Sequence, residues 1–278
     1  MSSQRNHCNS VLAAATPLPA AATMLPAHSV ALIILKTLIV LFMLDGLLQM
    51  ETSWNKSTRW FLLHFLVNMC VSYLVIPDMV VMLQDPTNNG LHPDILYNDS
   101  PLAITVGLHV YHCFTSYKTM TIVDWMHHLV SNMLVCVLCF SYHYGPLVSW
   151  GCFFVCGFPG GIDYGLLFLK STGWIHPMTE KRWNRGLNMW VRSPGIMMFI
   201  AFAYCSVMAG KYTVPLPVLL AQFVLNAVNA IYFADLVVAN AAICEWCHTH
   251  GVDKKQTEEW TAVKEKLGQE VDRRKKEK

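Results

Sequence analysis

Charged residues are scarce in this chain. Asp, Glu, Lys and Arg make up 14% of its 278 residues, while 54% of them are hydrophobic. Soluble domains carry about 25% charged residues, so this composition excludes an ordinary soluble globular protein. The chain is therefore predicted to be a membrane protein that crosses the bilayer several times.

Two further absences narrow the function. The chain has no phosphate-binding glycine loop and no serine-centred nucleophile elbow, so neither of these sites is indicated. Residues 1–27 lack the unbroken apolar core of a cleaved signal peptide, because Pro17, Pro19 and Pro26 interrupt them. We expect a flexible N-terminal segment, although the lack of any acid before Asp45 also fits a transit peptide.

Long apolar runs predict the fold. A membrane helix needs about 20 mostly apolar residues, or somewhat fewer when neighbouring helices shelter it. Seven segments meet this description: 28–50, 60–83, 102–117, 124–142, 147–169, 194–210 and 215–243. We expect an all-α bundle of about seven transmembrane helices over 28–245, followed by a basic cytosolic tail over 246–278.

The basic residues predict the orientation. If the segments alternate in direction, seventeen of the twenty Lys and Arg residues fall on one side. They lie in loop 51–59, turn 118–123, loop 170–193 and the tail. The other side has Arg5, Lys211 and the acidic loop 84–101, and Lys36 lies within the first segment. Since positive charge marks the cytosolic side, we expect a lumenal N-terminus and a cytosolic C-terminus.

The C-terminus suggests a location. Lys275 and Lys276 stand fourth and third from the end. They match the dilysine signal by which coat-protein retrieval machinery returns proteins to the endoplasmic reticulum. We therefore expect an endoplasmic-reticulum membrane protein; the alternative is a solvated basic tail.

Cysteines do not indicate a disulfide scaffold. Most of the ten lie inside apolar runs, where cysteine acts as a small hydrophobe. Cys244-Glu-Trp-Cys247-His248 has the spacing of covalent haem attachment. The expected cytosolic position argues against haem, and cysteines beside a membrane can instead carry lipid. We expect no cofactor and no metal.

Four histidines on two adjacent segments form the main candidate site. His109 and His112 are three residues apart and share a helix face. Asp124 and His128 are four apart and can form a hydrogen bond, with His127 beside them. Because the intervening turn is short, the four rings should meet near the cytosolic surface. Ionisable groups are costly in hydrocarbon and usually functional there; the alternative is an interfacial cluster that only caps a helix.

Other polar residues lie within apolar segments. Asp163 stands among glycines spaced by four, at 157, 161 and 165, which allow close helix packing. We expect the histidines to be its partners; the alternative is a hydrogen bond to backbone or a tyrosine hydroxyl. Gln222, Asn226 and Asn229 form a polar stripe that faces the bundle interior and can be structural.

Several motifs in order resemble the TLC domain, the family named for TRAM, LAG and CLN proteins. Asp124-Trp-Met-His-His128, followed by Leu-Val-Ser131, resembles its D-x-x-H-H-x-x-S/T signature. Asp163 resembles its later acidic position, and the resemblance covers roughly 55–245. Further matches are Asn184, Arg192, Pro194, Leu225-Asn226 and Asn229-Ala-Ile-Tyr-Phe233. Two positions depart from the family pattern: the residues that follow Asp163 differ, and Phe233 stands where the family has tryptophan. The longer signature of the ceramide synthases is also missing.

The resemblance implies a role in lipid metabolism. Ceramide synthases of the family join an acyl group from acyl-CoA to a sphingoid amine. In that case His127 or His128 would accept or activate the acyl group, Asp124 would orient the imidazole and Asp163 would deprotonate the amine or stabilise charge. The substrate pocket would be lined by His109, His112, Ser131, Asn226 and Asn229. Other members imply a non-enzymatic factor that binds lipid or influences membrane lipid composition.

A second resemblance concerns the fatty-acid elongases. Leu108-His-Val-Tyr-His-Cys113 is similar to their H-x-x-H-H box. Cys113 replaces the last histidine, and the glutamine motif expected soon afterwards is missing. An elongase-like histidine-box enzyme is therefore the third alternative.

Overall fold

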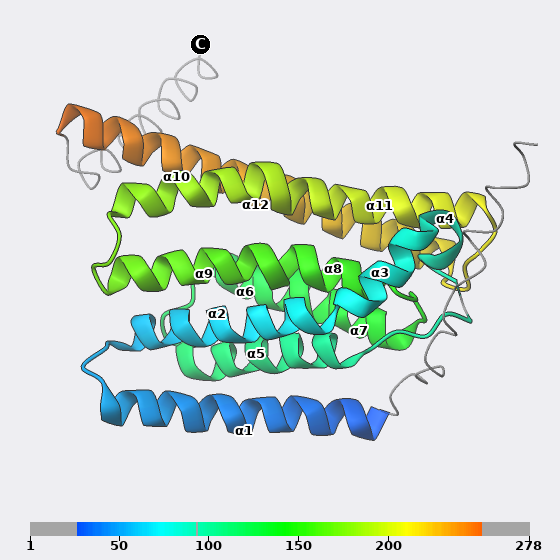
Figure 1. The fold of residues 1–278 in the computed structure, drawn as a ribbon, viewed down its shortest axis with the longest axis horizontal. Helices are drawn as coiled ribbons and strands as arrows, with labels where there is room; N and C mark the ends of the chain where they lie inside the picture. The colour runs from blue at the N-terminus through cyan, green and yellow to red at the C-terminus, as the bar shows by residue number, and fades with distance from the viewer. Residues whose placement is uncertain (1–26, 93, 252–278) are drawn as a thin grey trace, which may run out of the picture.

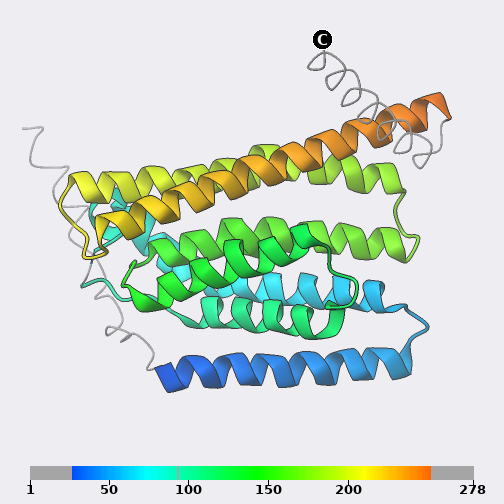
Figure 2. The ribbon, with the colours of Figure 1, turned by 180° about the vertical axis from the view of Figure 1, so that it is seen from behind.

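The computed structural model describes residues 27–92 and 94–251, without the side chains of residues 130–132. This part of the chain is helical and contains no strand, so the all-α prediction is confirmed for it. The helices lie side by side as rods along one common direction (Figure 1, and from behind Figure 2). Their bounds are α1 (Ala27–Glu51), α2 (Lys56–Leu74), α3 (Ile76–Gln84), α4 (Pro86–Asn89), α5 (Ser100–Ser116), α6 (Ile122–Met126), η1 (His127–Leu134), α7 (Val135–Ser141), α8 (Leu147–Cys152), η2 (Phe153–Gly157), α9 (Phe158–Ser171), α10 (Pro177–Leu187), η3 (Asn188–Arg192), α11 (Ser193–Met208) and α12 (Leu216–His250).

Four of these rods are long and apolar enough to cross a membrane: Ala27–Glu51, Leu147–Ser171, Pro177–Met208 and Leu216–His250. The pair α2 and α3, bent by 40° near Pro77, would make a fifth. The described chain is thus a helical protein suited to a membrane, with four to five spans by length and composition, and the predicted seven spans are not confirmed.

The predicted loop 170–193 is wrong over most of its length. Helix α10 begins at Pro177 and continues through η3 into α11 without a break. The Met178 backbone N–H donates to Nδ1 of His176 (3.2 Å), which caps α10, and proline is well tolerated in a first helical turn. An apolar run reveals only the second half of this rod, because the first half is polar.

The glycines spaced by four do allow close packing. A methyl group added at Gly161 of α9 would overlap Met69 of α2, and one at Gly165 would lie 3.0 Å from the Phe65 ring. One at Gly157 of η2 would lie 2.9 Å from Oγ of Ser72. All three glycines therefore face α2, and the prediction of a close helix contact is confirmed.

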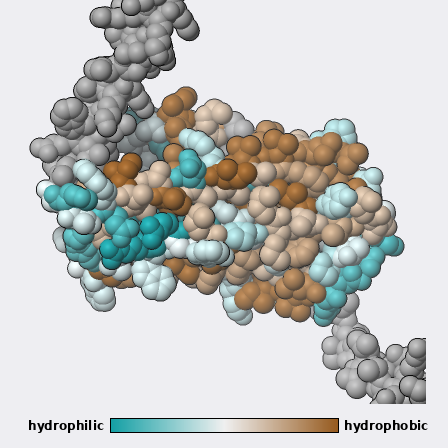
Figure 3. Space-filling model, turned by 90° about the horizontal axis from the view of Figure 1, so that it is seen from above, coloured by the Kyte–Doolittle hydropathy of each residue, from teal (hydrophilic) through white to brown (hydrophobic). Residues whose placement is uncertain are grey.

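The two ends of the bundle differ in charge. Since successive rods run in opposite directions, the 52–55, 117–121 and 172–176 connections share one end with the end of α12 (Figure 1). Basic residues near this end are Lys56, Arg59, Lys118, Lys170, Lys181, Arg182 and Arg185. In the view from above, hydrophilic residues gather at the left end, which is the basic end, and a smaller hydrophilic strip lies at the lower right. Hydrophobic residues cover much of the surface between them (Figure 3).

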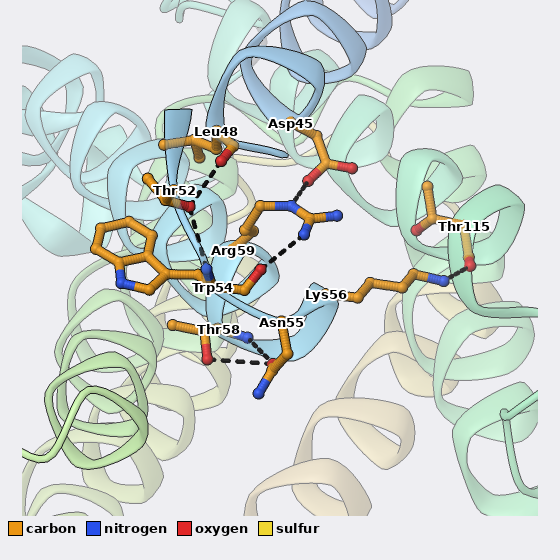
Figure 4. Close-up of polar contacts among 9 residues, drawn as sticks. All are labelled: Asp45, Leu48, Thr52, Trp54, Asn55, Lys56, Thr58, Arg59 and Thr115. Atoms are coloured by element: carbon orange, nitrogen blue, oxygen red, sulfur yellow. Dashed lines mark hydrogen bonds and ion pairs between the residues drawn. The ribbon is translucent and has the colours of Figure 1, made fainter. Parts of the chain in front are cut away.

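Polar contacts fix the turn between α1 and α2 at the basic end (Figure 4). Nε of Arg59 donates to Oδ1 of Asp45 (2.8 Å), and its Nη1 donates to the Trp54 carbonyl (2.9 Å). Asn55 caps α2 by accepting from the Thr58 backbone N–H (2.9 Å). Lys56 donates to the Thr115 carbonyl, which ties the turn to the end of α5. The ion pair explains how the charges of Asp45 and Arg59 are accommodated beside the apolar helix α1.

Two glycines of one rod should respond oppositely to alanine. At Gly195 an added methyl would overlap the Phe154 ring, so Gly195→Ala should destabilise the protein by about 1–3 kcal/mol. At Gly186 nothing lies within 4 Å of the added methyl, so Gly186→Ala should stabilise it by up to about 1 kcal/mol through helix propensity. Thermal unfolding of the detergent-purified variants measures both. Equal shifts of the same sign would contradict the packing described here.

Candidate functional site

Five histidines meet inside the bundle. His109 and His112 come from α5, His127 and His128 from η1, and His64 from α2. The ring centroid of His109 lies 6.0 Å from that of His127 and 5.1 Å from that of His128. The predicted approach of the four histidines is therefore confirmed, and a fifth joins them.

Contacts among the rings hold the cluster in place. Nδ1 of His109 and Nδ1 of His128 are 3.2 Å apart, so one ring donates to the other. The rings of His112 and His128 stack with centroids 4.8 Å apart. Trp60 packs on the outside, with its centroid 3.9 Å from that of His112 and 3.5 Å from that of His64. His128 is thus held by its neighbours on two sides.

The backbone of η1 places two successive histidines on the interior side. His127–Leu134 is a π-helical stretch within the continuous rod 122–141. A π-helix bonds each N–H to the fifth preceding carbonyl and is wider than an α-helix, and such segments are common at functional sites. The ring centroids of His127 and His128 lie 5.2 Å apart, so both reach the cluster.

A polar cavity of about 160 Å³ lies beside the cluster. It would hold roughly five water molecules at about 30 Å³ each. His64, His109 and His127 line it, whereas His112 and His128 do not. The remaining lining residues are Asn68, Leu108, Val155, Cys156, Gly160, Asp163, Tyr164, Arg192 and Phe233.

Opposite charges face this cavity without touching. Asp163 of α9 and Arg192 of η3 both line it and do not form an ion pair with each other. Oδ1 of Asp163, Nε of Arg192 and Nε2 of His109 are buried and have no hydrogen-bond partner among the described residues. Buried charges without partners are costly. The cavity is therefore built to hold molecules that accept from Arg192 and donate to Asp163.

This arrangement corrects the expected partner of Asp163. The histidines share its cavity but form no hydrogen bond with it, and the complementary charge comes from Arg192. Arg192 lies within the continuous rod of α10, η3 and α11 and not in a loop. Its side chain therefore lines the cavity inside the bundle.

Asp124 does not play the predicted role. Its Oδ2 accepts from the backbone N–H and the hydroxyl of Thr121, both at 2.8 Å, and the Thr121 hydroxyl accepts from the Asp124 N–H. This is a capping box at the start of α6. The predicted hydrogen bond to His128 is not formed, because the carboxylate accepts from the Thr121 N–H and hydroxyl at the start of its own helix. The capping alternative describes Asp124 correctly.

The polar stripe of α12 is divided between two other spaces. Asn226 donates to the Gln222 carbonyl (2.9 Å) and lines a cavity of about 50 Å³ that is mostly apolar. It therefore does not line the histidine cavity as predicted. Asn229 lines a groove of about 350 Å³ between α6 and α12. The side chain of Ser131 lies outside the described residues.

The groove is apolar and lies next to the histidine cavity. His127 and Phe233 line both spaces. Several groove residues are exposed on the side of the bundle, including Ile122 (76%), Met126 (55%) and Val228 (57%). His127 thus stands between an apolar groove at the surface of the bundle and a polar cavity inside it.

The remaining predicted features stand apart from the cavity. None of the nine cysteines of the described residues forms a disulfide, as expected. The ring of His248 lies 5.3 Å from that of His176 at the basic end of the bundle. Among residues 27–92 and 94–251, no three His, Cys, Asp or Glu side chains are arranged to hold one metal ion. Lys275 and Lys276 lie outside the described residues.

Among the ionisable residues that line the cavity, His64 and Arg192 were not predicted as site residues from the sequence. His64 is alone among apolar residues of α2, and only its four-residue spacing from Trp60 hinted at an interior face. Arg192 was grouped with a basic loop.

Comparisons of the chain with protein-family models, with curated proteins and with solved structures find no match.

Proposed function

We propose that this protein is a TLC-type membrane protein of lipid metabolism that transfers an acyl group from acyl-CoA to a lipid amine. One observation carries the proposal: a polar cavity with opposite charges in its lining lies next to an apolar groove, and His127 and Phe233 border both spaces. A lipid has the same division into a polar head and an apolar chain. The motif resemblance adds the reaction class.

The two spaces suit two parts of one substrate. The groove, with Ile122, Val228 and Tyr232 at its surface, would take the acyl chain directly from the bilayer. The cavity would take the reacting head, with Arg192 facing a negatively charged or carbonyl oxygen and Asp163 facing a hydroxyl or ammonium group. Charge-assisted hydrogen bonds of this kind are roughly twice as strong as neutral ones.

His127 is the best-placed group for covalent chemistry, because its ring borders both spaces. Its neutral imidazole nitrogen would attack the thioester carbonyl of acyl-CoA, forming a C–N bond while the C–S bond breaks and coenzyme A leaves as the thiolate. The lipid amine, as the free base, would then attack the acyl-imidazolium, and Asp163 would accept the proton that the amine nitrogen loses. An amide forms, the imidazole is released, and the proton passes from Asp163 to solvent or thiolate.

In this scheme His128 positions the reacting side chains. Its contacts with His109 at 3.2 Å and with His112 by stacking hold the cluster, while it does not line the cavity. His109 and His64 would supply donors or acceptors around the head group.

The proposed topology has seven crossings. Helix α5 and the rod 122–141 would be the two crossings that fall short by length or composition, sheltered by their neighbours. The basic end of the bundle would face the cytosol and the other end the lumen of the endoplasmic reticulum. The histidines would then be accessible to cytosolic acyl-CoA.

The second candidate function is lipid binding without catalysis. It is favoured by the capping role of Asp124, whose carboxylate accepts from Thr121 and not from the ring of His128. In this case the cavity would grip a lipid head group and the protein would influence membrane lipid composition.

One experiment separates these functions. Purified protein is incubated with acyl-CoA labelled in the acyl chain and with a sphingoid amine, and lipids are analysed by mass spectrometry. A labelled amide supports acyl transfer, whereas co-purified lipid without labelled product supports the binder. A lengthened labelled chain would indicate the elongase-like reaction instead. Metal analysis of the same sample, if it gave stoichiometric iron or zinc, would overturn the mechanism above.

A further inference from the structure

Two charged residues lie exposed along the apolar sides of the bundle. Lys36 is in the first half of α1, and Asp235 is past the middle of α12. Neither has an ion pair or a hydrogen bond within the described residues. Most other charged side chains of the rods have such a partner. Asp45, for example, forms an ion pair with Arg59 at 2.8 Å. Exposed charges in hydrocarbon are costly and call for a partner.

The surroundings of Asp235 suit a helix as the partner. A groove of about 530 Å³ runs between α12 and the η3–α11 rod, with Asp235 in its lining. Small or short side chains make up much of that lining, namely Ser193, Pro194, Ala230 and Ala234. Small residues allow the backbones of membrane helices to approach closely.

Helix α1 has an outer surface free to enter such a groove. Only Leu41 of its 25 residues is buried. It packs on α5 and α2 at one edge of the bundle, whereas α12 lies at the opposite edge (Figure 1). Exposed apolar residues surround Lys36, among them Leu32 (48%), Leu35 (52%) and Val40 (52%).

Contacts through the bundle place the two charges at similar depth. A methyl group added at Gly107 of α5 would lie 2.8 Å from Cβ of Thr37, so these residues are level. Two residues further on, His109 lies 6.0 Å from His127, whose ring is 5.1 Å from Phe233. Asp235 follows two residues later. If contacting residues are taken as level, the offset is one residue on α1, two on α5 and two on α12. At about 1.5 Å per residue, Lys36 and Asp235 then differ in depth by roughly 8 Å, which a lysine and an aspartate side chain can span together.

We propose that copies of this chain associate side by side in the membrane, with α1 of one copy in the α11–α12 groove of the next and Lys36 paired with Asp235. Both helices run in the same direction along the bundle (Figure 1), so this pairing is possible between copies of equal orientation. The contact joins two different surfaces, which produces rings or rows rather than a simple two-fold dimer.

Cysteine cross-linking in native membranes tests the contact directly. One tagged copy carries Leu32→Cys and a differently tagged copy carries Ile231→Cys, each one turn before the paired charge, in a background where the exposed Cys70 and Cys205 are serine. A short thiol cross-linker should join the two copies. As a matched control, Tyr73→Cys on the exposed side of α2 (75% exposed) should not form a cross-link with Ile231→Cys.

Charge reversal tests the pairing itself. Lys36→Asp or Asp235→Lys alone should reduce recovery of one tagged copy with the other by at least about tenfold. The double variant Lys36→Asp/Asp235→Lys restores opposite charges and should restore association. No cross-link between copies, association unchanged by the single reversals, or a well-folded double variant that stays apart would each overturn the proposal. Cross-linking of Ile231→Cys to a different protein would also overturn it.

Discussion

Replacing Arg192 by glutamine should destabilise the folded protein by about 3 kcal/mol, because the Asp163 carboxylate then has no opposite charge at its cavity. The replacement Asp163→Asn should have a cost of the same kind, since it leaves the guanidinium unbalanced. Unfolding midpoints and the monodisperse fraction in detergent measure both effects.

The double variant Asp163→Asn/Arg192→Gln provides the decisive comparison. Removing both charges avoids an unbalanced ion, so its loss of stability should be smaller than the sum of the single losses. Arg182→Gln is the matched control, because Arg182 is 57% exposed and pairs with Glu245 at the surface. It should change stability by less than about 1 kcal/mol. Strictly additive single effects would show that the two charges do not interact.

The fold was predictable wherever a rod is apolar along its length. Predicted segments 28–50 and 147–169 differ by one or two residues from Ala27–Glu51 and from the continuous rod Leu147–Ser171. The α10 half of the Pro177–Met208 rod escaped prediction because it is polar. Hydrophobicity reports which part of a helix contacts lipid or core, and it does not report where the helix begins.

The site was predictable where local spacing brings residues together. A short turn joins α5 to α6, so His109 and His112 had to meet His127 and His128. His64 and Arg192 reach the cavity through the packing of α2 and of the η3–α11 rod, which no spacing within the sequence encodes.

Asp124 illustrates a competition between local and tertiary contacts. Thr121-Ile-Val-Asp124 already has the form of a capping box, in which residues three apart satisfy each other's backbone N–H groups. The Asp124 carboxylate bonds to Thr121, which is only three residues away and needs an acceptor for its backbone N–H. The His128 ring, four residues on, bonds to His109 of another helix instead.

Replacing His127 by alanine should reduce acyl transfer by about 10²–10⁴-fold, because this ring is the one that borders both the head cavity and the chain groove. His128→Ala should cause a smaller loss, since it acts through its hydrogen bond to His109 and does not line the cavity. His143→Ala is the matched control, because its Nε2 contacts the Ile95 carbonyl (3.0 Å) at the opposite end of the bundle. Transfer of labelled acyl chain to the amine measures all three. If His127→Ala retained full transfer while His128→Ala abolished it, the acyl group would be carried by the second histidine, and the contact of His127 with both spaces would have another purpose.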